Sequence, residues 1–122
     1  MFLIDMNIYF LRSGQHIKIG HANNVEKRIK IFQTGNPHNV ELIYKFYCGQ
    51  DCKKIEAKLH KYLRTYRVNG EWFRSVKLIY SIVDTIKMDG INHTLGVLDI
   101  CYRFFDGSDY CYFKKTTNWM PK

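Results

Sequence analysis

The stretch NIYFLRSGQHIKIG, residues 7–20, decides the fold because it reads as two short strands joined by a tight turn. Two apolar runs flank Ser13 and Gly14, which predict a two-residue hairpin loop. That loop sets a register in which Tyr9 stands directly opposite Lys18. The other face of the strand pair then carries an apolar, core-facing strip: Ile8, Phe10, Ile17 and Ile19. A tyrosine opposite a lysine is explained either by cross-strand packing or by a functional site, and the strand pair alone leaves both open.

The composition is that of one globular domain with a basic surface. The chain has 122 residues, of which 46% are hydrophobic and 25% are charged, so it can bury a core and is not disordered. Nineteen Lys and Arg against eleven Asp and Glu give a net charge of +8, and aromatic residues make up 16%. Basic and aromatic residues together favour a polyanionic partner, although a positive surface also simply aids solubility.

From the N-terminal segment and the cysteines we expect a soluble intracellular protein, in the cytoplasm or nucleus, with no membrane segment. The opening MFLIDMN is too short an apolar run for a signal peptide or a membrane span. Without a sign of secretion, the four cysteines are expected as reduced thiols: Cys48, Cys52, Cys101 and Cys111. Their spacing does not favour a zinc site.

Helical spacing appears twice after the strand pair. Residues 23–34 repeat apolar side chains at Val25, Ile29 and Phe32, with Asn23 as the expected N-cap and Arg28 on the border of the stripe. Lys27 and Lys30 fall well outside that stripe. Arg28 can therefore flank a site, or it can simply extend its stem over the core edge.

A third strand, residues 39–48, leads to the second helix. Its apolar stripe consists of Ile55, Leu59, Tyr62 and Tyr66. Glu56 borders this stripe, and His60 lies one turn later, where it can bond to Glu56 or to a shared ligand, or form only a solvated contact. The segment RVNGEWFRS then reads as a loop, and residues 76–88 read as a helix that completes a compact α+β unit.

The pattern changes beyond Gly90. Two β-rich runs flank DGSD, which predicts a C-terminal β-hairpin over residues 90–122, packed on or next to a domain of residues 1–89. The predicted hairpin is rich in aromatic residues, which suit either base stacking or burial in an extra layer. Its basic residues are candidates for binding nucleic acid together with two from the first helix: Lys27, Lys30, Arg103, Lys114 and Lys115.

Five fragments in this order resemble the GIY-YIG endonuclease superfamily, and in particular a branch found in phage and other viral genomes. The NIY of residues 7–9 stands in the place of the first motif. The five fragments follow it: IKIG at 17–20, KR at 27–28, QTGNP at 33–37, ExxLH at 56–60 and GEWF at 70–73. The resemblance covers residues 7–88. It implies a three-stranded antiparallel sheet flanked by helices, with a site that hydrolyses phosphodiester bonds. It also implies that the protein acts in a cell infected by a virus or phage.

The resemblance also implies roles for individual residues. Tyr9 would orient or deprotonate the attacking water, and Arg28 would bind phosphate oxygens with its planar fork. Glu56 would ligate one Mg²⁺ or Mn²⁺ ion, since a protein often supplies only one carboxylate ligand to Mg²⁺. Lys18 stands where well-known members carry a second tyrosine. It would lower the pKa of the Tyr9 phenol from about 10, or hold a phosphate oxygen itself.

Two supporting residues and three candidate functions complete the predictions. His60 is a possible partner of Glu56, and Glu71 stands where the superfamily has an amide side chain. The favoured function is a metal-dependent endonuclease that acts on nucleic acid, DNA in preference to RNA. The alternative, which Lys18 would permit, is a catalytically weak or inactive binding or interaction module, and a more remote third is an inhibitor of a host factor. The sequence leaves the oligomeric state open.

Overall fold

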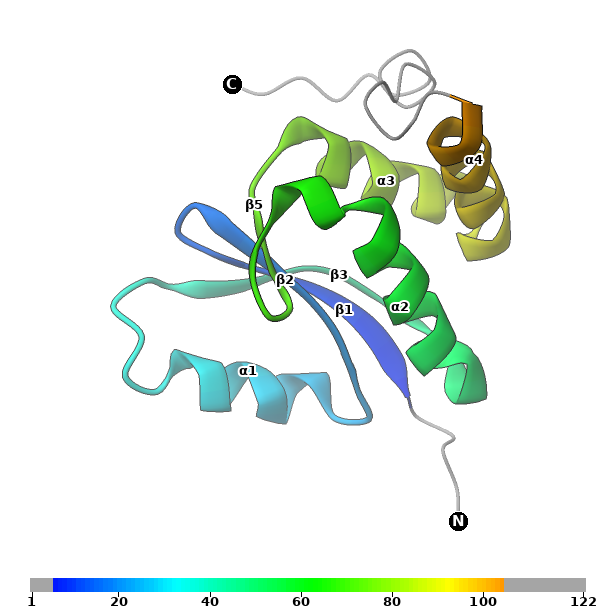
Figure 1. Cartoon of the computed structure of the whole chain (residues 1–122). Helices are drawn as coiled ribbons and strands as arrows, with labels where there is room; N and C mark the ends of the chain where they lie inside the picture. The colour runs from blue at the N-terminus through cyan, green and yellow to red at the C-terminus, as the bar shows by residue number, and fades with distance from the viewer. Residues whose placement is uncertain (1–5, 105–122) are drawn as a thin grey trace. The chain divides into compact units, whose positions relative to one another are not determined.

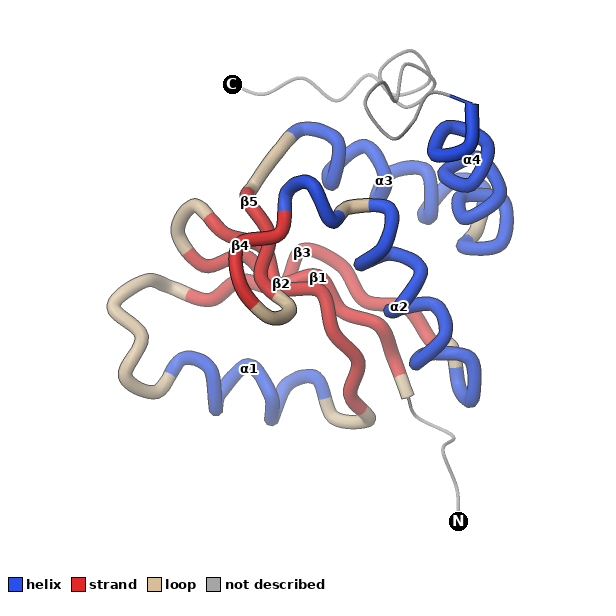
Figure 2. The backbone as a smooth tube through the Cα atoms, in the orientation of Figure 1, coloured by secondary structure: helices blue, strands red, loops and turns tan. Residues whose placement is uncertain are grey.

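The computed structural model describes residues 6–104, and the chain divides into two compact units between Ser75 and Val76. Figures 1 and 2 show the elements of each unit. The first unit holds the sheet and two helices: β1 (Asn7–Ser13), β2 (His16–Ala22), α1 (Val25–Gln33), β3 (Val40–Tyr47), α2 (Cys52–Tyr62), β4 (Arg67–Asn69) and β5 (Trp72–Arg74). Short 3₁₀ turns flank α2 at Gly49–Asp51 and Arg64–Tyr66. The second unit holds α3 (Lys77–Asp89) and α4 (Ile91–Phe104).

The sheet has five strands in the order β3-β1-β2-β5-β4, and all neighbours are antiparallel. The fold is α+β, but the predicted three-stranded sheet is wrong, because the segment RVNGEWFRS forms β4 and β5 rather than a loop. Each of these strands has three residues, too few for alternation to reveal a strand. The turn between them consists of Gly70 and Glu71, with Gly70 at φ +53°, so a glycine at the first loop position was the available hairpin signal.

The predicted hairpin register is also wrong, by two residues. Ser13 pairs with His16, so the loop consists of Gly14 and Gln15, and Gly14 has φ +59°. Glycine at the first loop position suits the tight turns that hairpins favour. A shift of two leaves every side chain on its predicted face, since side chains alternate with period two. Tyr9 now faces Gly20, however, while Lys18 faces Leu11.

Within the first unit, α1 and α2 cover opposite faces of the sheet (Figure 2). Tyr9 and Leu11 lie in a core cluster with Ala22, Val25 and Val40, against which Ile29 and Phe32 of α1 pack. The predicted apolar stripe of α1 is therefore confirmed. Its N-cap is Asn24 instead of Asn23, with the Lys27 amide donating to Asn24 Oδ1 at 3.0 Å. On α2 the buried residues are Cys52, Ile55, Leu59 and Tyr62.

Cys48 and Cys52 do not match the expectation of reduced thiols. They form a disulfide that links the end of β3 to the start of α2, with their Cα atoms 5.0 Å apart. Cys101 is a buried free cysteine. The disulfide lies one helical turn before Glu56, at the N-terminal end of the helix that carries it.

The second unit confirms one prediction and corrects another. Residues 77–89 form the predicted helix, with Ile79, Ile82 and Ile86 buried. The first run of the predicted C-terminal hairpin is instead helical through α4, because its buried residues repeat at helical spacing: Thr94, Leu95, Leu98 and Cys101. The DGSD turn and the second run lie outside the described residues, and the domain boundary at residue 89 stays a prediction. Within residues 6–104, none of the helices has the length and apolar character needed to span a membrane.

Candidate functional site

Gly20 is the point around which the candidate site is built. It pairs with Tyr9 across β1 and β2, and the tyrosine ring crosses the space that a side chain would fill. A Cβ atom on Gly20 would lie 2.5 Å from the Tyr9 hydroxyl oxygen and 2.8 Å from both Tyr9 Cζ and Glu71 Oε1. The missing side chain therefore lets a phenol and a carboxylate approach the same backbone position.

The Tyr9 hydroxyl is buried and makes no hydrogen bond of standard geometry with a described residue, although the Arg28 side chain lies close to it. Burial raises the pKa of Tyr9 to about 12, and the negative charge of Glu71 adds to the shift while Arg28 opposes it. The phenol is therefore neutral near neutral pH. The expectation that Lys18 lowers the pKa of this phenol is wrong, because Lys18 is directed to another partner.

That partner is Glu71, in the turn between β4 and β5. The Ile19 amide donates to the Glu71 carbonyl oxygen at 3.0 Å, which continues the pairing of β5 with β2 by one residue. Lys18 Nζ lies 3.3 Å from Glu71 Oε1, and its side chain is only 12% exposed. It also contacts two aromatic rings, with 4.8 Å to the centroid of Phe32 and 5.2 Å to that of Trp72. Lys18 is thus fixed beside Glu71 by an ion pair and two cation–π contacts.

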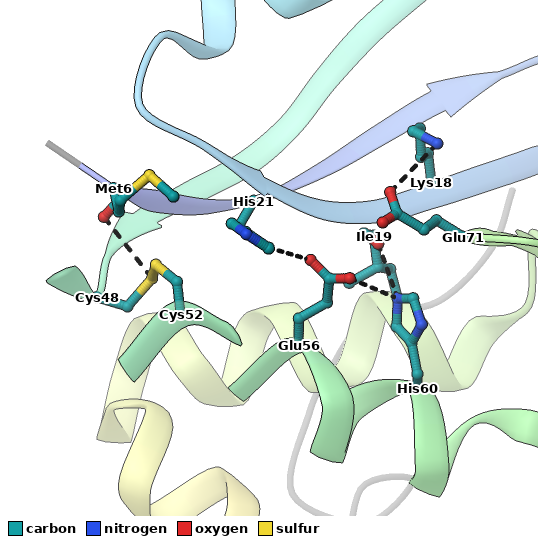
Figure 3. A network of polar contacts seen from close by, with 9 residues as sticks. All are labelled: Met6, Lys18, Ile19, His21, Cys48, Cys52, Glu56, His60 and Glu71. Atoms are coloured by element: carbon teal, nitrogen blue, oxygen red, sulfur yellow. Dashed lines mark hydrogen bonds and ion pairs between the residues drawn. A yellow bond between two sulfur atoms is a disulfide. The ribbon is translucent and has the colours of Figure 1, made fainter. Parts of the chain in front are cut away.

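Glu56 reaches the strands from α2, where it lies between two histidines (Figure 3). Its Oε1 is 2.5 Å from His21 Nδ1, and its Oε2 is 3.9 Å from His60 Nε2. Burial raises the pKa of the Glu56 carboxyl, the hydrogen bond with His21 opposes this shift, and the charge of Glu71 strengthens it. Two carboxylates, Glu56 and Glu71, therefore share a partly buried region, where the charge of Glu71 disfavours a charge on Glu56.

The main hydrogen bond of His60 is to the backbone of β2. Its Nε2 lies 2.8 Å from the Ile19 carbonyl oxygen, and since a carbonyl only accepts, Nε2 carries the proton and donates. Its ring also meets Phe73 edge-on, with 5.0 Å between ring centroids. The predicted contact with Glu56 is the longer one, so His60 holds α2 against β2 at the residue before Gly20.

The remaining predicted residues separate into two groups. Arg28 is half-buried on α1, and its charge acts on the Tyr9 phenol. Lys27 and Lys30 are exposed on the same helix. Arg103 is exposed on α4 and pairs with Asp99 at 2.9 Å, while Lys114 and Lys115 lie outside the described residues. The structure thus brings Tyr9, Lys18, Arg28, Glu56 and Glu71 together, and it does not place the other basic residues with them.

His21 belongs to this cluster and was missed by the sequence reasoning. It directly follows IKIG, on a strand whose pairing was expected to end at Gly20. The pairing of Ile8 with His21 continues the strand and turns the imidazole to the side of α2. A polar residue after the apolar run was the available signal, but only the extended strand shows that Glu56 lies opposite.

The donor set fits a hard divalent cation held by few protein ligands. Within residues 6–104, no three His, Cys, Asp or Glu side chains are grouped closely enough to cage a metal. Mg²⁺ needs no such cage, because one or two carboxylates and phosphate oxygens are its usual partners. Glu56 and Glu71 supply two carboxylates whose mutual repulsion a cation would relieve, beside a buried hydroxyl that makes no hydrogen bond of standard geometry with a described residue.

Comparison with known proteins places the chain in a family. The KilA-N domain-containing protein 315L of Invertebrate iridescent virus 6 is 35% identical over 60 residues, which make up 47% of this chain and 25% of that protein. The chain thus covers only about a quarter of the length of that relative. No solved structure matches the chain. Residues 6–87, which include every residue of the cluster around Gly20, match the T5orf172 domain, and the chain therefore belongs to the T5orf172 domain family.

Proposed function

We propose that this protein is a metal-dependent endonuclease that hydrolyses phosphodiester bonds in nucleic acid, with DNA as the preferred substrate. The observation that carries the proposal is the Tyr9 hydroxyl, a buried polar group without a hydrogen bond of standard geometry in the described chain, held beside two carboxylates and an arginine. A hydroxyl in that state costs stability unless a ligand satisfies it. The resemblance to the GIY-YIG superfamily supports the same residues.

Each residue has a role that its surroundings support. Tyr9, as a neutral phenol, would hold the attacking water or a phosphate oxygen by a hydrogen bond. Arg28 would bind phosphate oxygens and stabilise the charge that develops on them. Glu56, with Glu71 beside it, would hold Mg²⁺ or Mn²⁺, which when bound supplies Lewis-acid stabilisation of the phosphate. Lys18 would keep Glu71 in place through their ion pair.

The histidines would act through other groups. His21 donates to the Glu56 carboxylate and fixes its orientation, while His60 fixes the backbone of Ile19. A carboxylate that is oriented in advance loses less freedom when it binds a cation. Both histidines are therefore positioning residues.

A second candidate is a nucleic-acid-binding module that does no chemistry. The observation in its favour is the ion pair of Lys18 with Glu71, which already neutralises one of the two carboxylates. The two candidates differ in a single assay. Supercoiled plasmid, single-stranded DNA and structured RNA are incubated with the full chain, with and without Mg²⁺ or Mn²⁺. Cleavage that requires the metal supports the endonuclease, and binding without cleavage of any substrate supports the module.

Both candidates predict binding that weakens steeply with salt. The net charge of +8 favours contact with several phosphates, and each contact releases counterions. Affinity for a labelled oligonucleotide, measured by fluorescence anisotropy without metal, is expected to fall at least about tenfold between about 50 and 200 mM salt. An affinity that stays constant over this range would contradict nucleic acid as the partner.

A further inference from the structure

A pocket of about 290 Å³ lies in the first unit, and none of the proposed catalytic residues lines it. One wall is the loop between α1 and β3, which contains most of QTGNP, and it contributes Asn36 and His38. A second wall is the hairpin of β4 and β5, which contains NGEW, residues 69–72, and contributes Val68, Asn69 and Trp72. The turn between β1 and β2 closes the pocket with Ser13 and His16. The QTGNP motif, which the proposed chemistry leaves unused, and the residues on either side of Glu71 thus form one cavity.

The QTGNP wall is rigid before any ligand arrives. Gln33 Nε2 donates to the carbonyl oxygens of Asn36 at 3.4 Å and His38 at 3.0 Å, while its Oε1 accepts from the Val40 amide at 2.8 Å. Asn36 Nδ2 donates to Ser13 Oγ at 3.0 Å, and Asn36 Oδ1 accepts from the His38 amide at 2.9 Å. One glutamine and one asparagine side chain therefore brace the loop against the hairpin, which lowers the entropic cost of binding.

The lining combines aromatic rings with amide groups. Trp72 and the imidazoles of His16 and His38 offer flat surfaces. The amide of Asn36 uses one of its two N–H groups and one of its two oxygen lone pairs in the bonds above, so one donor and one acceptor of the same amide remain for a ligand. A donor and an acceptor on one amide are the groups with which an asparagine reads the edge of a base. The volume lies at the small end of the range for ligand pockets, which suits one ring system.

The pocket is connected to the candidate site through Trp72. Its ring contacts Lys18 Nζ, whose ion-pair partner is Glu71, and it meets Phe32 edge-on at 6.4 Å. His16 and Gly20 are four residues apart on β2, which is about 13 Å. A stacked strand covers this distance in about four nucleotides, and an extended strand needs fewer. One strand can therefore reach both places.

We propose that this pocket holds one unstacked nucleobase of the strand bound at the site, stacked on Trp72 and read by Asn36. Arg74, which is exposed and pairs with the lining residue His16 in the sheet register, lies over the Tyr66 ring at 5.5 Å and would supply a positive charge near the phosphate of that nucleotide. This inference rests on the proposed function in one respect: it takes nucleic acid as the ligand, and it does not require cleavage. It adds a site of base recognition a few nucleotides from the cleaved bond.

The first test uses the full chain and mononucleotides. The Trp72 indole N–H and the side-chain amides of Asn36 and Asn69 are followed by NMR, and Trp119→Phe assigns the two indole signals. We expect these signals to shift with at least one nucleoside monophosphate and not with deoxyribose 5-phosphate, which has no base. The absence of any shift, or equal shifts with the sugar phosphate, would overturn the proposal.

The second test measures binding without metal, by anisotropy, to homopolymeric 12-mers and to a 12-mer of abasic residues. We expect the abasic strand to bind about tenfold more weakly than the best homopolymer, the scale of losing a stacked base. His16→Ala, at an exposed lining position, should reduce this ratio toward one, and Trp72→Ala should do the same if it folds. Tyr47→Ala, which removes an aromatic ring that is 62% exposed on β3, should leave the ratio unchanged.

The outcomes separate the two proposals. A protein that cleaves but binds the abasic strand as tightly as the homopolymers has no base pocket, although it is an endonuclease. A protein that discriminates between these strands but cleaves nothing has the base pocket and is a binding module. A protein that binds no nucleic acid overturns both proposals.

Discussion

Glu56→Gln is expected to reduce metal-dependent cleavage by more than about a hundredfold while the protein remains folded. The amide has the shape of the carboxylate and can still accept a hydrogen bond from His21, which now reaches Glu56 at 2.5 Å. The amide carries no charge, so the cation would lose a principal protein ligand. Weaker binding of the cation would lower the rate of cleavage. Single-turnover cleavage at saturating protein, together with circular dichroism, measures both effects.

The matched control for Glu56 is Glu26→Gln, which removes the same charge from an exposed position. Glu26 pairs with Lys45 at 2.9 Å on the surface, and exposed pairs contribute little to stability. We expect this variant to cleave at the parental rate. Oligonucleotide affinity without metal should be unchanged or slightly tighter for both variants, since each loses one negative charge. Full activity of Glu56→Gln at ordinary Mg²⁺ levels would show that this carboxylate does not hold the metal.

Gly20→Ala is expected to lose both activity and stability. Its new Cβ atom would lie 2.5 Å from the Tyr9 hydroxyl oxygen, and Tyr9 is fully buried, so the ring can move only by displacing its neighbours. Overpacking of this kind costs about 1–3 kcal/mol, and displacement of reacting groups by about 1 Å can slow a reaction about a hundredfold. Urea unfolding and the single-turnover rate report the two losses separately.

The control for Gly20 is Gly96→Ala, in the exposed interior of α4. A Cβ atom there has no neighbour within 4 Å among the described residues, and alanine favours the helix by about 1 kcal/mol relative to glycine. This variant should therefore be as stable as the parent or more stable. A Gly20→Ala variant that behaves in the same way would mean that Tyr9 and Glu71 do not depend on the missing side chain.

Local patterns in the sequence were enough to predict the strands and helices that carry Tyr9, Arg28 and Glu56. The hairpin alternates strictly, and α1, α2 and α3 each repeat apolar residues over several turns, so periodicity locates them. Because side chains alternate with period two, the error of two residues in register left Tyr9 and Lys18 on one face. The resemblance then supplied the roles of individual residues, which periodicity cannot.

The features that the sequence did not reveal depend on contacts between distant segments. β4 and β5 are too short to show a period, yet they place Glu71 beside Gly20 and thereby direct Lys18 away from the Tyr9 hydroxyl. The raised pKa of Tyr9 follows from burial and from Glu71, and neither can be read from residues near Tyr9 in the chain. The segment of α4 was predicted as a strand because it is rich in β-forming residues, but the same residues also have helical spacing, and the segment is a helix.

The most direct test of the account is the Tyr9→Phe variant, measured for cleavage rate and for urea unfolding in parallel with the parent. The central claim is that the buried hydroxyl serves the reaction and not the fold. Because the hydroxyl makes no hydrogen bond of standard geometry in the described chain, its removal should leave the free energy of unfolding unchanged or raise it by about 1 kcal/mol. The rate should fall on the order of a hundredfold, with oligonucleotide affinity unchanged. A Tyr9→Phe variant that cleaves as fast as the parent would contradict the claim.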